Sequence, residues 1–499
     1  MAVVASVSGL NVAQPDLAAT FGASQSEVLW IINAYTVTLA ALLLPLGAVG
    51  DRWGRRPVLV TGLLVFGVAN VAAAIAPSTE AMVAARLVSG VGAAMIMPVT
   101  LSVITASFPA AERSRAIGTW TAVAGGGGIL GMYLSALLVD VATWRWLFVL
   151  PVVLTVVALV LGLRTVPGSR VPATGRPDVV GALTSVVATL GLTSALHEAP
   201  SLGWDAPFVL VALGAATVAG AVFVAWELRV GSPLLDVRHF RARGLSVGTS
   251  SLLVLFGVVG GVSLVLYPFL QVVLGWGGLR STLGLMPLAV LMMVTSGLAP
   301  RVAARLGARL TIAAGLGAAA AGLALMALLV SPDRGYVAIL PGLAVTGLGA
   351  GLAMTPSTEA ITSSLPREQQ GVASALNDLT RELGSALGIA LLGGVVVAGY
   401  RSAVEGRLAG VPDDLAAAAR EGLANAAAAS RDAGPDAAPV LVAAQEAFVQ
   451  AWQQAMTVGV GVLVVLALLV LLRGPRREHA APTSGEARPR QDSNLRPRD

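Results

Sequence analysis

The chain contains no cysteine, no lysine and only three histidines among its 499 residues. Without cysteine it can form no disulfide, thiol nucleophile or thiolate metal site, and three scattered histidines are too few for a zinc centre. Charged residues make up only 12%, about half the roughly 25% of an ordinary soluble domain. So few charges could not cover the surface of a soluble domain. We therefore expect no enzyme, no metal site and no cofactor.

Long apolar segments are abundant instead: hydrophobic residues make up 56% and the mean hydropathy is +0.81. Runs that can span a bilayer, about 20 residues each, recur at 1–14, 27–49, 58–76, 80–106, 114–139, 146–163, 179–197, 207–226, 245–271, 281–303, 310–330, 336–357, 371–399 and 449–472. They lack the alternation of barrel strands, so we expect helices. The first run is short and ends at Pro15 and Asp16, which indicates a truncated first helix more than a signal peptide.

The arginines predict the orientation of these helices. If both termini are cytoplasmic, 23 of the 32 arginines fall in inside loops or the C-terminal tail and seven in outside loops, while Arg86 and Arg381 lie within spans. Arginine excess marks the cytoplasmic side. We therefore expect an all-α integral protein of the inner (cytoplasmic) membrane with 14 transmembrane helices and both termini cytoplasmic. The net charge of +5 then reflects topology, and we expect no nucleic-acid partner.

The spans divide into two bundles and an insertion. Residues 1–164 are expected to form an N-terminal six-helix bundle and residues 245–473 a C-terminal one, with a long outer loop at 401–447. A linker with two inserted transmembrane helices occupies 165–244. The polar, arginine-rich residues 474–499 are expected to form a disordered cytoplasmic tail.

A short turn occurs twice, at Arg52–Arg56 and again 253 residues later at Arg305–Arg309, both with the spacing RxGxR. Ala304 stands where the first copy has Asp51, so the halves are similar but not equal. Paired bundles related by pseudo-symmetry are common in secondary transporters.

The first turn lies within the stretch from Gly47 to Leu59, which has the pattern G-x-x-x-D-R-x-G-R-R-x-x-L. RxGRR alone is typical of any inside loop, but the whole pattern resembles the signature loop of the major facilitator superfamily. The resemblance implies a cytoplasmic gate in which Asp51 lies against the N-terminus of a helix in the other half. The candidate gating residues are Gly47, Gly50, Asp51, Arg52, Gly54, Arg55 and Arg56.

Four further stretches resemble the fourteen-helix drug:proton antiporter branch of that superfamily, the EmrB/QacA type. They are Asn11–Pro15, Trp30–Thr36, Arg86–Ala94, and Gly371–Asp378 with its continuation to Gly384. Two departures matter. The Gly-Pro pair that marks antiporters in the fifth helix is absent from Gly131–Ala136, and Ser6 stands where the family often carries an acid in the first helix.

The candidates for proton coupling are Arg86, Glu359, Asp378, Arg381 and Glu382. A central arginine in a span is unfavourable, so Arg86 either faces a wet interior or reaches out from a helix end; the resemblance implies that it tunes proton movement. Asp378, Arg381 and Glu382 lie at i, i+3 and i+4 on one helix. They form either a proton-carrying cluster near Glu359 or a surface pair at a helix start.

The sparse aromatic and amide side chains expected near a substrate cavity are Trp30, Asn33, Tyr35, Trp120, Tyr133 and Tyr267; each could instead anchor the interface or fill the core. The expected function is proton-coupled multidrug or antibiotic efflux by alternating access, with a small amphiphilic or drug-like substrate, protons and the lipid bilayer as partners. The alternatives are an exporter of an endogenous metabolite that gives self-resistance, or a non-transporting membrane sensor or enzyme.

Overall fold

The computed structural model describes residues 2, 3, 6, 10, 13–166, 168, 176–408, 410–434 and 437–474. Several predicted segments lie outside the described residues: much of the first span with the Asn11–Val12 part of its motif, residues 167 and 169–175 of the 165–244 linker, and the tail beyond Gly474. The described part is helical throughout, without a strand. Twelve of its segments are long and apolar enough to cross a membrane, and α6 (Ala110–Val141) is also long enough at 32 residues.

The first group of helices comprises α3, α4, α5 and α7, whose bounds are Gln25–Trp53, Arg55–Ala74, Thr79–Ser107 and Val149–Thr165. Helix α5 packs on both α3 and α4, and α7 packs on α4. A short helix, α2 (Gln14–Phe21), precedes them, and Pro15 lies in its first turn, where the missing N–H has no helical partner to lose. Pro15 therefore begins a new helix after the first predicted span.

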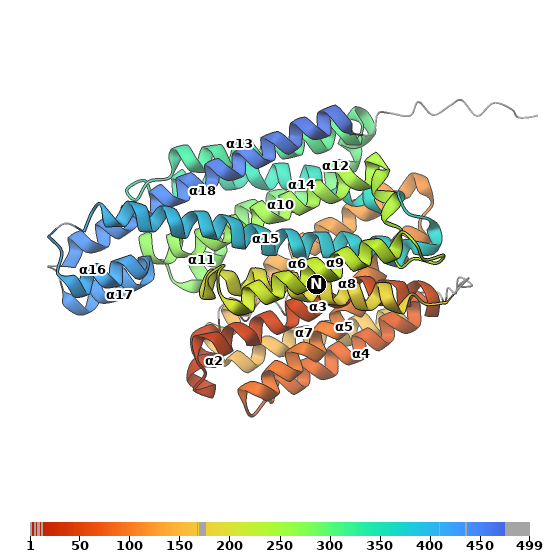
Figure 1. The fold of residues 1–499 in the computed structure, drawn as a ribbon, viewed down its shortest axis with the longest axis horizontal. Helices are drawn as coiled ribbons and strands as arrows, with labels where there is room; N and C mark the ends of the chain where they lie inside the picture. The colour runs from red at the N-terminus through yellow and green to blue at the C-terminus, as the bar shows by residue number, and fades with distance from the viewer. Residues whose placement is uncertain are drawn as a thin grey trace, which may run out of the picture.

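The second group comprises α10, α12, α13, α14, α15 and α18, at Arg243–Pro268, Met286–Leu306, Ala308–Leu329, Leu340–Ser363, Gln370–Glu405 and Ala438–Arg473. Its closest neighbours are α13 with α14, α10 with α15, and α12 with α14. Helix α6 follows α5 in the chain and is counted with the first group; it runs along the boundary between the groups and packs mainly on α12 and α14, while α3 and α5 contact α15. The two groups lie one above the other in Figure 1.

The inserted hairpin, α8 (Val179–Leu202) and α9 (Pro207–Glu227), lies beside this boundary. Helix α8 packs on both α3 and α15, and Leu196 forms a small apolar cluster with Ala386 and Ala390 of α15. The insertion thus contacts both groups.

The repeated RxGxR turns share one backbone geometry. Gly54 joins α3 to α4 with φ 100° and ψ 143°, and Gly307 joins α12 to α13 with φ 86° and ψ 152°. Both values lie in a region that only glycine adopts readily, so each glycine permits one helix to follow another without a loop. This common turn supports the internal repeat seen in the sequence.

The predicted outer loop at 401–447 contains two short helices, α16 (Asp413–Glu421) and α17 (Leu423–Ala433), packed on α18. The Tyr400 hydroxyl donates to the Ala419 carbonyl at 2.8 Å and so ties α16 to α15. This segment extends past the helix bundle at the left of Figure 1.

Candidate functional site

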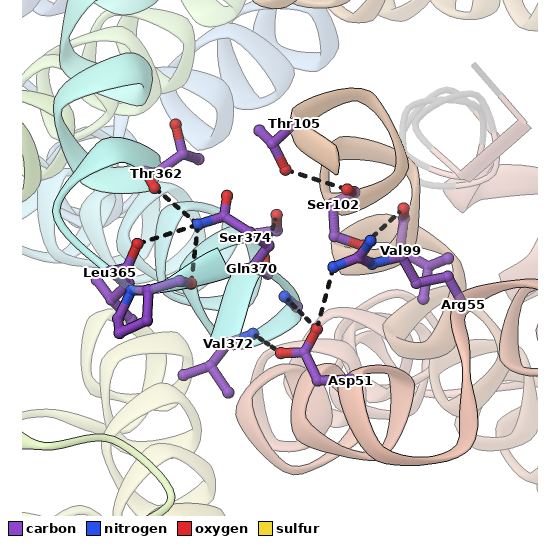
Figure 2. Close-up of polar contacts among 12 residues, drawn as sticks. Asp51, Arg55, Val99, Ser102, Thr105, Thr362, Leu365, Gln370, Val372 and Ser374 are labelled. Atoms are coloured by element: carbon purple, nitrogen blue, oxygen red, sulfur yellow. Dashed lines mark hydrogen bonds and ion pairs between the residues drawn. The ribbon is translucent and has the colours of Figure 1, made fainter. Parts of the chain in front are cut away.

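The Asp51 carboxylate joins the two groups at the end of the molecule that we call the Asp51 end. It accepts backbone N–H bonds from Gly371 at 2.8 Å and from Val372 at 3.1 Å (Figure 2). These amides lie in the first turn of α15, where backbone donors have no intrahelical acceptor, and α15 has no side-chain cap of its own. The negative charge also lies at the positive end of the helix dipole. Asp51 therefore caps α15 from a different helix group.

Arg55 supports this contact. Its guanidinium lies 3.7 Å from Asp51 Oδ1, and both side chains are only 8% exposed. One turn earlier, Gly47 lets α3 and α15 approach closely, since a Cβ there would come within 2.7 Å of the Gly371 carbonyl oxygen and of the Ala375 Cβ. The sequence motif thus supplies both the charge and the room for the contact.

The other residues of the motif have different neighbours. Arg56 donates to the Leu163 carbonyl at 2.7 Å and ties α4 to α7. A Cβ at Gly50 would meet only Val99 of α5, at 3.2 Å. These contacts, like the Gly54 turn, lie within the first group.

A second hydrogen bond joins the groups at the same end. The Ser114 hydroxyl of α6 donates to the Glu359 carboxylate of α14 at 2.7 Å. The sequence singled out Glu359 as a neighbour of the Asp378 cluster, but the structure gives it a partner on the opposite side of the boundary. Ser114 carried no sequence signal, because a lone serine at a helix start is common.

Gln370 fixes the start of α15. Its side-chain amide donates to the carbonyls of Thr362, Leu365 and Pro366 at 3.0–3.2 Å (Figure 2). The turn between α14 and α15 is thereby held to the same helix end that Asp51 caps.

The cluster on α15 is buried. Asp378 is fully buried and lies 3.8 Å from Arg381, whose side chain is 14% exposed. Asn377 donates to Asp378 Oδ1 at 3.2 Å, whereas Asp378 Oδ2 has no hydrogen-bond partner within the described residues. A surface pair at a helix start therefore does not describe these groups.

Arg381 spans the boundary through aromatic rings. Its guanidinium lies 4.6 Å from the ring centre of Phe256 on α10 and 5.9 Å from that of Trp120 on α6. Glu382, the next residue, is half-buried and makes no hydrogen bond or ion pair within the part of the chain that the structure describes. Phe256 was not predicted, because nothing in the sequence distinguishes it from lipid-facing aromatics.

Arg86 is fully buried in the first group. Its Nε donates to the Ile31 carbonyl at 3.2 Å and its Nη1 to the Ser6 hydroxyl at 2.9 Å, and its guanidinium lies 4.4 Å from the Tyr35 ring centre. Its Nη2 has no partner, and it forms no ion pair with any acid of the described residues. The burial of Arg86 excludes one of the two expectations for it, namely that its side chain reaches out from a helix end.

Ser6 links this arginine to a further polar side chain, since its hydroxyl donates to Asn70 Oδ1 at 3.3 Å. Asn70 in turn donates to the Phe66 carbonyl at 2.7 Å. The position at which related sequences often carry an acid thus lies against Arg86, but here it offers a neutral hydroxyl.

The predicted cavity residues lie on three helices, α3, α6 and α10. Tyr35 is fully buried against Arg86, and Trp120 lies beside Arg381 and donates to Thr100 at 3.4 Å. Trp30, Asn33, Tyr133 and Tyr267 are each half-buried, on α3, α6 and α10. Tyr35 therefore lies beside Arg86, and Trp120 lies beside Arg381.

Comparisons with known proteins agree with this architecture. The family model described as Major Facilitator Superfamily matches residues 1–389. The multidrug efflux pump LfrA of Mycolicibacterium smegmatis is 35% identical over 427 residues, which cover 85% of this chain and 84% of that protein. The multidrug resistance protein Stp of Mycobacterium tuberculosis (strain ATCC 25618 / H37Rv) is 33% identical over 408 residues, covering 81% and 76%.

The cephamycin export protein CmcT of Amycolatopsis lactamdurans is 33% identical over 396 residues, covering 78% of this chain and 81% of that protein. Among solved structures, the proton:xylose symporter XylE superposes with a TM-score of 0.56 at 15% identity, covering 95% of each chain. That likeness concerns the fold. Together with the Asp51 contact and the paired turns, these matches show that this multi-pass membrane protein belongs to the major facilitator superfamily.

Proposed function

We propose that the chain exports small amphiphilic or drug-like molecules across the cytoplasmic membrane by proton-coupled alternating access. The observation that carries the proposal is the Asp51 contact with the start of α15, which closes one end between two helix groups. The relatives named as multidrug efflux and antibiotic resistance proteins supply the substrate class. The proposal includes the fourteen-span array, two six-helix bundles with an inserted hairpin, and both termini in the cytoplasm, so that the Asp51 end is cytoplasmic.

The proton carriers in this proposal are Asp378 and Glu382. Both lie on α15 at the boundary between the groups, beside the stacked Arg381. Arg381 can pair with Asp378 while that carboxylate is charged, and protonation would free the guanidinium from it. Movement of Arg381 away from Trp120 would then loosen a contact between the groups. Protonation and the change of conformation are thereby coupled at one helix.

The test uses inside-out vesicles and ethidium, a lipophilic cationic dye. An imposed inside-acidic gradient should drive dye uptake into vesicles that hold the wild-type protein, and a protonophore should abolish it. Asp378→Asn or Glu382→Gln should reduce gradient-driven uptake at least about tenfold, whereas Glu421→Gln on the outer segment should not. Gradient-independent uptake by the wild type would contradict proton coupling, and unchanged uptake by both variants would remove these acids from the mechanism.

The orientation can be tested separately, because the chain has no native cysteine. Asp333→Cys lies in an exposed turn at the end opposite Asp51, and Ser232→Cys in an exposed turn at the Asp51 end. A membrane-impermeant maleimide should label Asp333→Cys in intact cells and Ser232→Cys only after permeabilisation. The reverse pattern would overturn the orientation.

A second candidate, export of an endogenous metabolite, is favoured by the similarity to the cephamycin export protein. It uses the same site and differs only in its substrate. Uptake of a metabolite of the producing cell by the same vesicles, in competition with ethidium, would distinguish it.

A further inference from the structure

Two carboxyl groups meet at the base of the inserted hairpin, away from the groups used in the proposed transport mechanism. Asp178 is the N-cap residue of α8, and Glu227 is the last residue of α9. Their carboxyl groups lie side by side, since they accept from the adjacent amides of Leu234 and Leu235. Both converge over Gly181, where an added Cβ would collide with Glu227 Oε1 and Asp178 Oδ2. Glycine at this position makes room for the pair.

Three of the four carboxyl oxygens are occupied by N–H donors. Asp178 Oδ1 accepts from the Gly181 amide and from the Trp226 indole, both at 2.8 Å, and Oδ2 accepts from the Leu234 amide at 3.2 Å. Glu227 Oε2 accepts from the Leu235 amide at 3.3 Å. The fourth oxygen, Glu227 Oε1, is buried and has no N–H or hydroxyl donor in the described part of the chain.

The environment offers little to neutralise two negative charges. Glu227 has no exposed surface, and Asp178 is half-buried. The arginines of the adjoining segments, Arg176, Arg229 and Arg238, are exposed; Arg238 donates to the Leu228 carbonyl at 2.6 Å. Asp236, the N-cap residue of the short helix at 237–241, lies 3.8 Å from His239.

Two touching carboxyl groups in such a site repel when both are charged, and they form a hydrogen bond only when one carries a proton. We propose that Asp178 and Glu227 share one proton. This proton holds the chain segment between α9 and α10 against the base of the inserted hairpin. The proton resides on Glu227 Oε1, the one oxygen that lacks a donor. It forms an O–H···O hydrogen bond within the pair, and no other bond is made or broken. This inference is independent of transport.

The segment that the pair holds contributes to the hydrophobic core. Leu234 and Leu235, whose amides the pair accepts, are buried in the main hydrophobic core together with Leu245 of α10. Loss of the shared proton would place two charges side by side and drive the two carboxylates apart, so the Leu234 and Leu235 amides would lose their acceptors as the side chains separate. The connection into the second group would then loosen as the pH rises.

The test is hydrogen–deuterium exchange of the peptide that spans residues 228–236, in purified protein in nanodiscs with a chelator and without substrate or gradient. The exchange rate measured for this peptide is divided by the intrinsic rate of its unprotected amides at each pH from about 6 to about 9. For the wild type we expect this ratio to rise about tenfold per pH unit once the proton is lost, the slope of one proton. In Glu227→Gln the side-chain N–H₂ replaces Oε1 and its proton, so the ratio should stay low at every pH. Glu198→Gln, a matched change of another buried acid on the hairpin, should behave as the wild type.

A wild-type ratio without pH dependence, or the same slope in Glu227→Gln, would overturn the proposal, and so would a flat response in Glu198→Gln. Infrared difference spectra give a second readout that does not require a variant that folds. The wild type should show a protonated-carboxyl C=O band, still present in the Asp378→Asn/Glu382→Gln double variant, that loses intensity as the exchange ratio rises. A spectrum without that band would equally overturn the shared proton. Because neither measurement involves transport, failure of the proposed efflux activity would leave both outcomes unchanged.

Discussion

The Asp51 carboxylate accepts a 2.8 Å hydrogen bond from the Gly371 amide, 320 residues away in the chain. The bond supplies α15 with the N-terminal cap that its own sequence lacks. Because the acceptor belongs to α3 and the donor to α15, the cap exists only while the two helix groups are together at this end. Its free energy therefore stabilises the closed arrangement specifically.

Replacing the charge of Asp51 should favour separation of the two helix groups at the Asp51 end. Asp51→Asn keeps one acceptor oxygen but loses the second, the ion pair with Arg55 and the interaction with the helix dipole. Together these are worth about 1–2 kcal/mol, which would shift the ratio of open to closed molecules about 5- to 30-fold. Spin labels at Arg164→Cys and Leu306→Cys, exposed positions on α7 and α12, report the distance between the groups. Asp414→Asn, an exposed acid, is the control; a distance distribution unchanged by Asp51→Asn would contradict the prediction.

The Ser114 bond to Glu359 should contribute in the same direction and by a similar amount. Ser114→Ala removes one charge-assisted hydrogen bond, about 1.5 kcal/mol, and we expect roughly a tenfold shift toward the open distance of the same label pair. Ser363→Ala, which removes only a local bond to Ala360, should leave the distribution as it is. An equal effect of the two serine substitutions would show that Ser114 does not join the groups.

The close approach of α3 and α15 at Gly47 should stabilise the closed Asp51 end as much as the charge of Asp51 does. Gly47→Ala places a methyl group against the Gly371 carbonyl oxygen, a backbone atom that cannot rotate away. Overpacking of this kind typically destabilises by about 1–3 kcal/mol, so the labels should report an open end even with Asp51 intact. Gly220→Ala, where nothing lies within 4 Å, is the matched change. A closed distribution in Gly47→Ala would show that the helices adjust without separating.

Arg86 should be more important for activity than for stability. It is fully buried and forms no ion pair in the described structure, and a buried charge without an opposite charge is unfavourable. Arg86→Met removes the hydrogen bonds to the Ile31 carbonyl and the Ser6 hydroxyl, but Ile31 lies inside α3, where the helix supplies a donor, and Ser6 keeps its bond to Asn70. We expect a melting temperature equal to or above that of the wild type, with at least about a tenfold loss of gradient-driven ethidium uptake. Arg401→Met, an exposed change, tests whether loss of positive charge alone matters; a lower melting temperature for Arg86→Met would contradict this account.

The features that could be predicted from the sequence are those fixed by local chemistry. Gly54 and Gly307 need a positive φ for helices that follow one another directly, and the apolar runs give the spans close to the observed helix bounds. Asp51 was predicted as a residue that meets a helix N-terminus only through the family resemblance. The structure identifies that helix as α15 and the amides as those of Gly371 and Val372.

What could not be predicted depends on how distant helices pack. Ser114 with Glu359, and Asp178 with Glu227, are ordinary residues at helix ends until the fold brings them together. The same holds for Phe256 and Trp120, since aromatic residues in apolar spans are as suited to lipid as to an arginine. A single sequence gives the spacing along a helix but not which helix lies opposite it.

Helix α15 is continuous over 36 residues, about 54 Å at 1.5 Å per residue. Its first turn is capped by Asp51, its middle carries Asp378 and Arg381, and its last turns hold α16 through Tyr400. A rigid-body tilt of this helix that frees Gly371 at one end also displaces α16 at the other. An antibody or other ligand that immobilises α16 should therefore restrict motion at the Asp51 end without touching it.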